Sequence, residues 1–162
     1  MPDSVDPDFA VAESMPEQLR LQNQLCFPLY AASRLVTRLY QPQLDRLGLT
    51  YPQYVVLMIL WESAPLTVNE IGQRAMLSSN TLTPLLKRLE AQGLVSRQRD
   101  SADERRVVIS LTEQGLALRG ECECIPQTLF EQAGLNVEEA LELKRLLDAL
   151  LPGLERAVEG TA

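Results

Sequence analysis

The 162-residue chain contains no histidine. This absence excludes the usual histidine-containing zinc sites and acid–base catalysis by an imidazole. The three cysteines (Cys26, Cys122 and Cys124) are odd in number and too few for a disulfide scaffold. The Cys-x-Cys pair alone is an incomplete metal site, so we expect neither a metal nor a cofactor.

Long hydrophobic runs are absent as well. No apolar stretch approaches the roughly 18 residues that a membrane helix needs. The acidic, proline-containing start MPDSVDPDFAVAESMPE lacks the basic first residues and apolar middle of a secretory signal. We therefore expect a cytoplasmic protein without membrane contact, in which residues 1–18 form a disordered acidic tail.

Positive charge is scarce overall but unevenly distributed. The net charge is −7, yet residues 67–112 hold seven basic and five acidic side chains. The remainder holds eight basic and seventeen acidic ones. The middle of the chain is therefore the one part suited to a polyanion.

Helical periodicity dominates the first two thirds of the chain. Apolar residues recur at helical spacing from about Leu19 to Leu47, and Gly48 ends this predicted helix. Thr50 precedes YPQYVVLMILWES, which is apolar nearly all round and so predicts a buried helix. Thr67 and the glutamate three residues later have capping-box spacing and open a short helix. The next segment, SSNTLTPLLKRLEAQG, predicts a helix with a leucine stripe and a glycine stop.

The period then changes to that of strands. LVSRQR and RRVVISLT alternate and are joined by the polar turn DSADE, so they predict a β-hairpin. Thr112 caps one further helix, and Asn136 with Glu139 caps another, whose leucines repeat in threes and fours. The terminal helices carry more apolar surface than one small domain can hide, which indicates a helical dimer interface.

A short helix, a tight turn, a second helix and a basic hairpin together predict a winged helix-turn-helix. We expect a mainly α fold with a small β-hairpin wing. Its divisions are the tail at 1–18, an N-terminal dimerisation helix at 19–49, the winged helix-turn-helix at 50–112 and C-terminal dimerisation helices at 113–162.

This arrangement suits double-stranded DNA, because a helix fits the major groove and an arginine at the wing tip can enter the minor groove. The simpler alternative is a plain helical domain with a solvated, charged hairpin. The candidate DNA-binding residues lie off the leucine stripe or on the hairpin: Ser79, Asn80, Thr83, Lys87, Arg88, Arg105 and Arg106.

The segment from LTVNEIGQRAML through the D-x-x-D-E-R-R wing to the following LT resembles the DNA-binding core of the MarR family. NQLCF, LYQPQLDRLGLTYPQY and LTPLLKRLE are similar to its OhrR-like branch, whose members sense organic hydroperoxides. The resemblance spans roughly Leu19 to Leu151. It implies a homodimer with intertwined terminal helices that binds a pseudo-palindromic operator as a repressor, and not an enzyme.

Cys26 is the candidate sensor. A free cysteine on an apolar helix face is most often an inert core residue. The resemblance gives it another function, and implies that Tyr40 and Tyr51 reach it from the partner subunit. Tyr30 would be its neighbour one turn along the same helix. The hypothesis is that a hydroperoxide oxidises the Cys26 thiolate to sulfenic acid, a second thiol forms a disulfide with it, and the operator is released.

Two departures from the OhrR-like pattern leave alternatives open. The position of the usual resolving cysteine aligns with Glu131, so Cys124, Cys122 or a small cellular thiol could take its place. Pro28 would remove a hydrogen bond inside a helix but costs little in a first turn. Either it kinks a helix that begins near Leu19, or the helix starts afresh near Phe27, with Cys26 at its N-terminus.

Two other functions compete with peroxide sensing. One is a MarR-type repressor released by a small aromatic or lipophilic ligand, in whose pocket Cys26 would be only a lining residue. The other is a thiol peroxidase, which would need catalytic turnover with a reductant. A winged helix gives no reason to expect the second.

Overall fold

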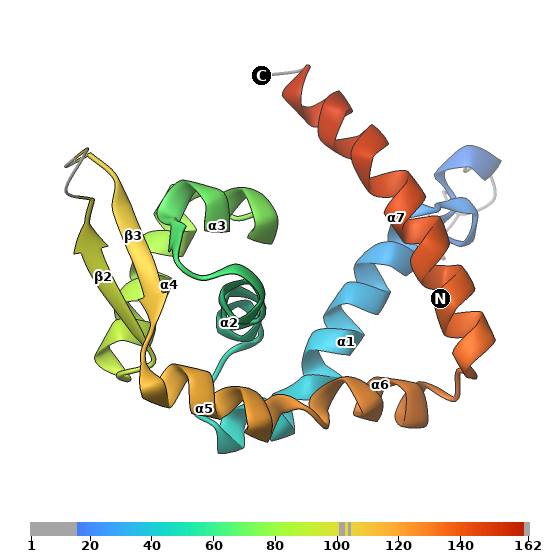
Figure 1. The fold of residues 1–162 in the computed structure, drawn as a ribbon. Helices are drawn as coiled ribbons and strands as arrows, with labels where there is room; N and C mark the ends of the chain where they lie inside the picture. The colour runs from blue at the N-terminus through green and yellow to red at the C-terminus, as the bar shows by residue number, and fades with distance from the viewer. Residues whose placement is uncertain (1–15, 101–102, 104, 161–162) are drawn as a thin grey trace, which may run out of the picture. The chain divides into compact units, whose positions relative to one another are not determined.

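The computed structural model describes residues 16–100, 103 and 105–160. The chain divides into two compact units, Met1–Leu39 and Tyr40–Ala162, which are described separately. The expected disordered tail lies almost entirely outside the described residues. Figure 1 labels the seven α-helices of the described residues and strands β2 and β3.

The first unit contains two short 3₁₀ turns, Glu17–Leu19 and Leu21–Asn23, and the first part of helix α1, Cys26–Arg46. The prediction of one helix from about Leu19 is therefore wrong. Pro28 lies in the first turn of α1, where the N–H groups have no helical acceptor and the missing donor costs little. Of the two alternatives for Pro28, the helix starts afresh, and Cys26 is its first residue.

The second unit is built on three helices that share one core. Helices α2 (Tyr51–Ser63), α3 (Val68–Ala75) and α4 (Ser79–Ala91) begin at the predicted caps Thr50, Thr67 and Ser78. Seven of their apolar side chains have no measurable exposure: Val56, Leu57, Leu60, Ile71, Leu82, Leu86 and Leu89. The predicted leucine stripe is confirmed except at Leu85, which is only half-buried.

The predicted hairpin is confirmed as strands β2 (Val95–Arg99) and β3 (Val107–Leu111), which lie side by side beside α4 in Figure 1. A third strand, β1 (Leu66–Thr67), was not predicted; it pairs with the other edge of β3, and the sheet order is β1-β3-β2. All pairings are antiparallel. The sheet fixes the start of α3 against the base of the wing, because β1 leads directly into that helix.

The Leu-Thr pair at the end of β3 has a local structural explanation. Thr112 precedes helix α5 (Glu113–Cys122), and its hydroxyl donates to the Gly93 carbonyl at 2.6 Å and accepts from the Gly115 N–H at 3.0 Å. A Cβ at Gly115 would lie 1.9 Å from the Leu94 carbonyl oxygen, so only glycine fits. Trp61 of α2 donates its indole N–H to the Gly115 carbonyl at 2.8 Å. These contacts join α5 firmly to the winged region.

Two helices complete the described chain: α6 (Ile125–Ala133) and α7 (Val137–Glu159). Asn136 and Glu139 form the predicted capping box at the start of α7, with hydrogen bonds of 2.9 and 3.0 Å. No residue of this 23-residue helix is buried. Among the described residues, no helix has the length and hydropathy to cross a membrane.

Candidate thiol site and nucleic-acid interface

Cys26 is exposed, not part of a core, within the single chain. Its Sγ lies 3.9 Å from Oε1 of Gln24, just before the helix, and its neighbours Leu25 and Phe27 are also exposed. Cys26 is the first residue of α1. An accessible thiol at such a position can react with an incoming oxidant.

Tyr30 lies one turn beyond Cys26 on the same helix, as predicted, and its ring is exposed. The guanidinium carbon of Arg34 lies 5.6 Å from the ring centroid, which is a cation–π distance. Arg34 therefore holds the aromatic ring and places a positive charge on this unit of the chain.

The other two predicted tyrosines meet in the second unit. The rings of Tyr40 and Tyr51 stack with centroids 5.7 Å apart. Tyr54, which sequence reasoning did not assign to the site, lies 6.5 Å from Tyr40 and 6.4 Å from Tyr51 and extends the cluster to Trp61 at 6.3 Å. The three tyrosines recur along Y-x₁₀-Y-x-x-Y, and the i, i+3 spacing of the last two on α2 could have indicated this neighbourhood.

Burial raises the pKa of Tyr40, and the neighbouring Tyr51 adds to the effect. Burial likewise raises the pKa of Tyr54 to about 12, with a smaller contribution from the Cys122 thiol. These hydroxyls therefore stay protonated at neutral pH and remain hydrogen-bond donors. A thiolate would be stabilised by such donors.

Cys122 and Cys124 have different environments although one residue separates them. Cys122 is 3% exposed at the end of α5, and burial, followed by the nearby Glu121, raises its pKa to about 11. Cys124 is exposed and directly precedes α6. At neutral pH the Cys122 thiol is protonated and shielded, whereas Cys124 is accessible to other molecules.

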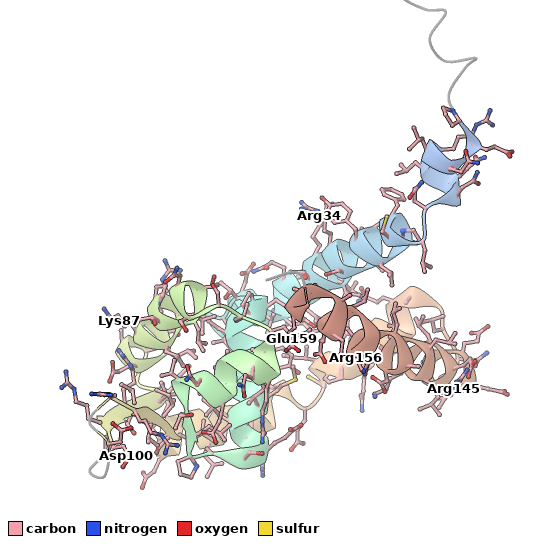
Figure 2. All side chains as sticks on the ribbon, turned by 90° about the horizontal axis from the view of Figure 1, so that it is seen from above. Arg34, Lys87, Asp100, Arg145, Arg156 and Glu159 are labelled. Carbon is pink, nitrogen blue, oxygen red and sulfur yellow. The ribbon has the colours of Figure 1, made fainter. Side chains whose placement is uncertain are left out.

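The candidate DNA-binding residues of α4 lie on the side opposite its buried leucines. Ser79, Asn80, Lys87 and Arg88 are exposed, and Thr83 is half-buried. Figure 2 shows Lys87 extending its amino group away from the helix. The structure thus leaves these polar side chains accessible on the second helix of the helix-turn-helix.

Arg105 and Arg106 are both exposed at the wing. The backbone N–H of Arg105 donates to the Asp103 carboxylate at 3.1 Å, and that of Arg106 donates to the Asp103 carbonyl at 2.9 Å. Hydrogen bonds from Thr67 are the main cause of the lowered pKa of Glu70 in α3. The positive charge of Arg106 lies close enough to lower it further. The wing arginines and the start of α3 therefore form one neighbourhood.

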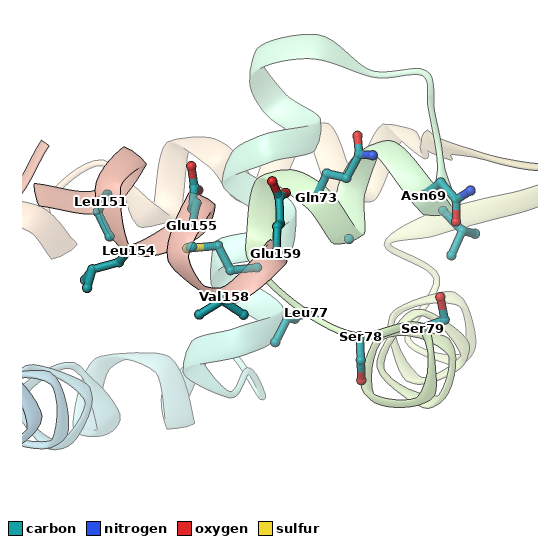
Figure 3. A pocket seen from close by; sticks show the side chains of 13 residues that line it. Asn69, Gln73, Leu77, Ser78, Ser79, Leu151, Leu154, Glu155, Val158 and Glu159 are labelled. Atoms are coloured by element: carbon teal, nitrogen blue, oxygen red, sulfur yellow. The ribbon is translucent and has the colours of Figure 1, made fainter. Parts of the chain in front are cut away.

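An open pocket of 870 Å³ lies between α3, the start of α4 and α7, all in the second unit (Figure 3). Its walls combine apolar side chains, among them Leu77, Leu151 and Leu154, with the carboxylates of Glu155 and Glu159. All of its lining residues belong to the second unit, whereas Cys26 belongs to the first, so this pocket does not test the expectation that Cys26 lines a ligand pocket.

Residues 38–119 match the family model described as "Transcriptional regulator SarA/Rot". The chain is also 49% identical over 139 residues to the organic hydroperoxide resistance transcriptional regulator of Bacillus subtilis strain 168. That alignment covers 86% of this chain and 92% of the relative.

Solved structures of AbfR, a protein of Staphylococcus epidermidis, are similar over nearly the whole fold. The reduced, DNA-bound form is 42% identical, covers 88% of this chain and 97% of AbfR, and gives a TM-score of 0.73. The disulfide form is 43% identical, covers 88% and 95% of the two chains, and gives a TM-score of 0.60.

Proposed function

Because the chain belongs to the SarA/Rot-type winged-helix transcriptional regulators of the MarR family, we propose that it is a cytoplasmic homodimeric repressor released from its operator when an organic hydroperoxide oxidises Cys26. The observation that carries the proposal is the exposed thiol of Cys26 at the first residue of α1. The similarity to a hydroperoxide resistance regulator and to AbfR, known in reduced and disulfide forms, supports it.

DNA contact is assigned to the exposed side chains of α4 and to the wing. Asn80 and Thr83 can hydrogen-bond to base edges in the major groove, while Lys87 can neutralise phosphates. Arg105 at the wing suits the negative potential of a narrow minor groove. In this assignment α4 recognises the base sequence, whereas the wing positions the protein on the DNA and increases its affinity.

Dimerisation is assigned to the terminal helices, at 19–49 and 113–162. The strongest support is α7, in which no residue is buried by the chain itself. Five exposed apolar side chains lie along one face of that helix at helical spacing: Val137, Leu141, Leu151, Leu154 and Val158. Such a stripe stabilises a helix only when another surface covers it, and a second copy supplies an equal stripe.

The chemical step is a two-electron oxidation of sulfur. The Cys26 thiolate attacks the terminal oxygen of the hydroperoxide, an S–O bond forms as the O–O bond breaks, and the alkoxide takes a proton and leaves as an alcohol. A second thiol then attacks the sulfur of the sulfenic acid, an S–S bond forms and water leaves. The hydroxyls of Tyr40 and Tyr51 from the partner subunit would donate to the starting thiolate and lose that interaction after oxidation.

Cys124 is the better candidate for the resolving thiol. The attacking sulfur must be ionised and accessible, whereas Cys122 is buried with a pKa raised to about 11. Cys124 is exposed at the start of α6. We therefore assign Cys122 to the core and Cys124 to the disulfide, with a small cellular thiol as the remaining alternative.

The test uses DNA selected by the reduced protein from a random-sequence library and follows its release by fluorescence anisotropy. Cumene hydroperoxide should release the wild-type protein and leave Cys26→Ser bound, because serine cannot form a sulfenic acid. Cys122→Ser is a matched control that should still respond. Release of Cys26→Ser by peroxide would show the sensor assignment to be wrong.

Mass spectrometry of the oxidised protein separates the second step from the first. A peptide linking Cys26 to Cys124 is expected from wild type, while Cys124→Ser should give sulfenic or further oxidised Cys26 without that link. A link from Cys26 to Cys122 would overturn the assignment of the resolving thiol and leave the sensor assignment intact.

One observation favours the second candidate function, a repressor released by a small lipophilic ligand. The pocket of Figure 3 has a volume within the range of small-molecule sites, about 300–1,000 Å³. Glu155 and Glu159 at its wall favour a neutral or cationic compound over an aromatic acid. A compound of that class that releases Cys26→Ser from DNA would establish this function.

A further inference from the structure

We infer that a cationic pocket at the base of the wing binds one phosphate group of the DNA backbone; this assignment rests on the DNA binding proposed above. The wing-base pocket has a volume of 270 Å³ and is lined by Thr67, Asn69, Thr83, Arg97, Arg105 and Arg106. At about 30 Å³ per water molecule, this space holds a tetrahedral oxyanion and several waters. The DNA contacts assigned above do not include Arg97, Thr67 or Asn69.

Arg97 provides the main geometric argument. It lies in β2 opposite Ile109 of β3, and its side chain is only 21% exposed. One of its terminal nitrogens is 3.5 Å from the Glu90 carboxylate, at the limit of a hydrogen bond. Its Nε is buried and has no acceptor within the described part of the chain. A buried, charged N–H group without an acceptor is unfavourable. The Nε itself is closed to a ligand in this arrangement, so an oxygen from outside would meet the exposed part of the side chain that lines the pocket.

The charges around the pocket favour a polyanion over a free small anion. Three arginines, Arg97, Arg105 and Arg106, are among its lining residues. Two carboxylates oppose them: Glu90 beside Arg97, and Glu70, which accepts from the Thr67 N–H at 2.7 Å and contacts Arg106 electrostatically. The small positive surplus would hold a free anion weakly. A DNA phosphate is instead brought to the pocket by the other contacts of the same duplex.

The uncharged donors place the pocket next to the proposed major-groove surface. Thr83 lies on α4 between Asn80 and Lys87 at helical spacing, so it borders both that surface and the pocket. Asn69 is exposed in the first turn of α3 and can donate from its side-chain amide. A phosphate held here would fix the depth and angle of α4 in the groove, which is the usual contribution of backbone contacts.

The test measures the affinity for a long mixed-sequence DNA duplex, and for the selected DNA, across a range of KCl concentrations. Arg97→Gln should weaken binding to both DNAs by at least about tenfold, because a charge-assisted bond is lost in each protomer. The plot of log Kd against log salt should become shallower by about 2, since each lost phosphate contact removes about 0.9 and a dimer makes two. Thermal melting first establishes that each variant is folded.

Three matched variants sharpen the result. Arg119→Gln removes the same charge from an exposed position on α5 and should leave the salt slope unchanged. Asn69→Ala removes a donor without a charge, so it should weaken binding at every salt concentration and keep the wild-type slope. Glu90→Gln should tighten binding by removing the competing carboxylate, and this gain should vanish when Arg97→Gln is also present.

Two outcomes would overturn the inference. One is a salt slope for Arg97→Gln equal to that of wild type while Arg105→Ala still reduces it; the proposed DNA interface would then stand and the phosphate pocket would not. The other is displacement of DNA by inorganic phosphate at constant ionic strength, which would identify a site for free anions. Unchanged binding in Arg105→Ala and Lys87→Ala alike would instead disprove the proposed DNA interface itself.

Discussion

The central region of the chain and its two ends differ in what a single copy can bury. Every buried side chain that the structure describes lies between Tyr40 and Ile125. The described side chains of the ends, those of residues 16–39, 126–128 and 131–160, include no buried one, although these ranges contain most of α1 and all of α7. A helix in the sequence therefore does not imply a core that one chain can form alone. The central region buries its own apolar side chains, whereas the helices of the ends need another surface to cover theirs.

In the proposed function, DNA binding and peroxide sensing are likewise assigned to these two different regions. The proposed DNA-binding surface comprises α4 and the wing, and α4 packs against the closed core through its buried leucines. The candidate sensor, Cys26, lies in an end in which no described side chain is buried by the chain itself. Oxidation can therefore change how two copies are arranged without unfolding either winged region, which is the property required of a bistable interface.

The largest expected effect tests whether α5 belongs to the closed region. Gly115→Ala would place a Cβ 1.9 Å from the Leu94 carbonyl oxygen and should lower the free energy of unfolding by at least about 3 kcal/mol. Gly120→Ala on the same helix meets nothing within 4 Å and should be neutral or stabilising by about 1 kcal/mol. Urea unfolding compares the two, and equal stabilities would show that α5 is not docked as described.

The sequence predicted the closed region well, because local signals and the final packing agree there. The caps at Thr50, Thr67 and Thr112 and the glycine stop after α4 each lie where the structure ends or begins an element. The apolar faces of α2 to α4 are the faces that are buried. The hairpin was likewise apparent from its alternating pattern.

The failures have two physical causes. Strand β1 is two residues long and exists only through pairing with β3, a non-local contact that periodicity does not reveal. The predicted helix start at Leu19 rested on apolar residues at helical spacing. In this unit no core buries those residues, and Pro28 is compatible with the first turn of a helix but not with its interior. Similarly, the different burial of Cys122 and Cys124 is set by how α5 docks, so the site's thiols could be found in the sequence but not ranked.

The second prediction concerns the dependence of α7 on a partner. Leu151 is 41% exposed, so a partner can contribute about 1.4 kcal/mol by burying the rest of its side chain, and does so twice in a symmetric dimer. Leu151→Asp should therefore weaken dimerisation by about 100-fold. Sedimentation equilibrium over a range of concentrations measures this change.

Leu146→Asp is the matched control for the dimer experiment. Leu146 is 52% exposed on the same helix, but it lies away from the apolar stripe that contains Leu141 and Leu151. It should therefore change the dimer dissociation constant much less. If both variants weaken dimerisation equally, the stripe is not the interface, and if neither does, α7 is not covered by a second copy.

The smallest expected effect lies at the border between the two regions, where Cys122 is buried and Cys124 is exposed. Burial raises the pKa of the Cys122 thiol from 9.0 to about 11. Between these values the unfolded chain releases its proton while the folded chain keeps it, so stability present below about pH 9 is lost as the pH rises through about 11. This group alone should cost up to about 2 kcal/mol between about pH 8 and pH 10.5.

Cys122→Ala should remove this contribution to the loss of stability at alkaline pH. The substitution also leaves a small cavity, which destabilises the protein equally at both pH values. Cys124→Ala, which removes an exposed thiol, should retain the wild-type dependence. Urea unfolding at the two pH values gives the change in the free energy of unfolding for each variant, so that any effect of a substitution that is the same at both pH values cancels.

If Cys122→Ala loses as much stability as wild type between the two pH values, Cys122 is not shielded in solution. The border of the closed region would then lie nearer the start of α5, and Cys122 would regain its candidacy as the resolving thiol.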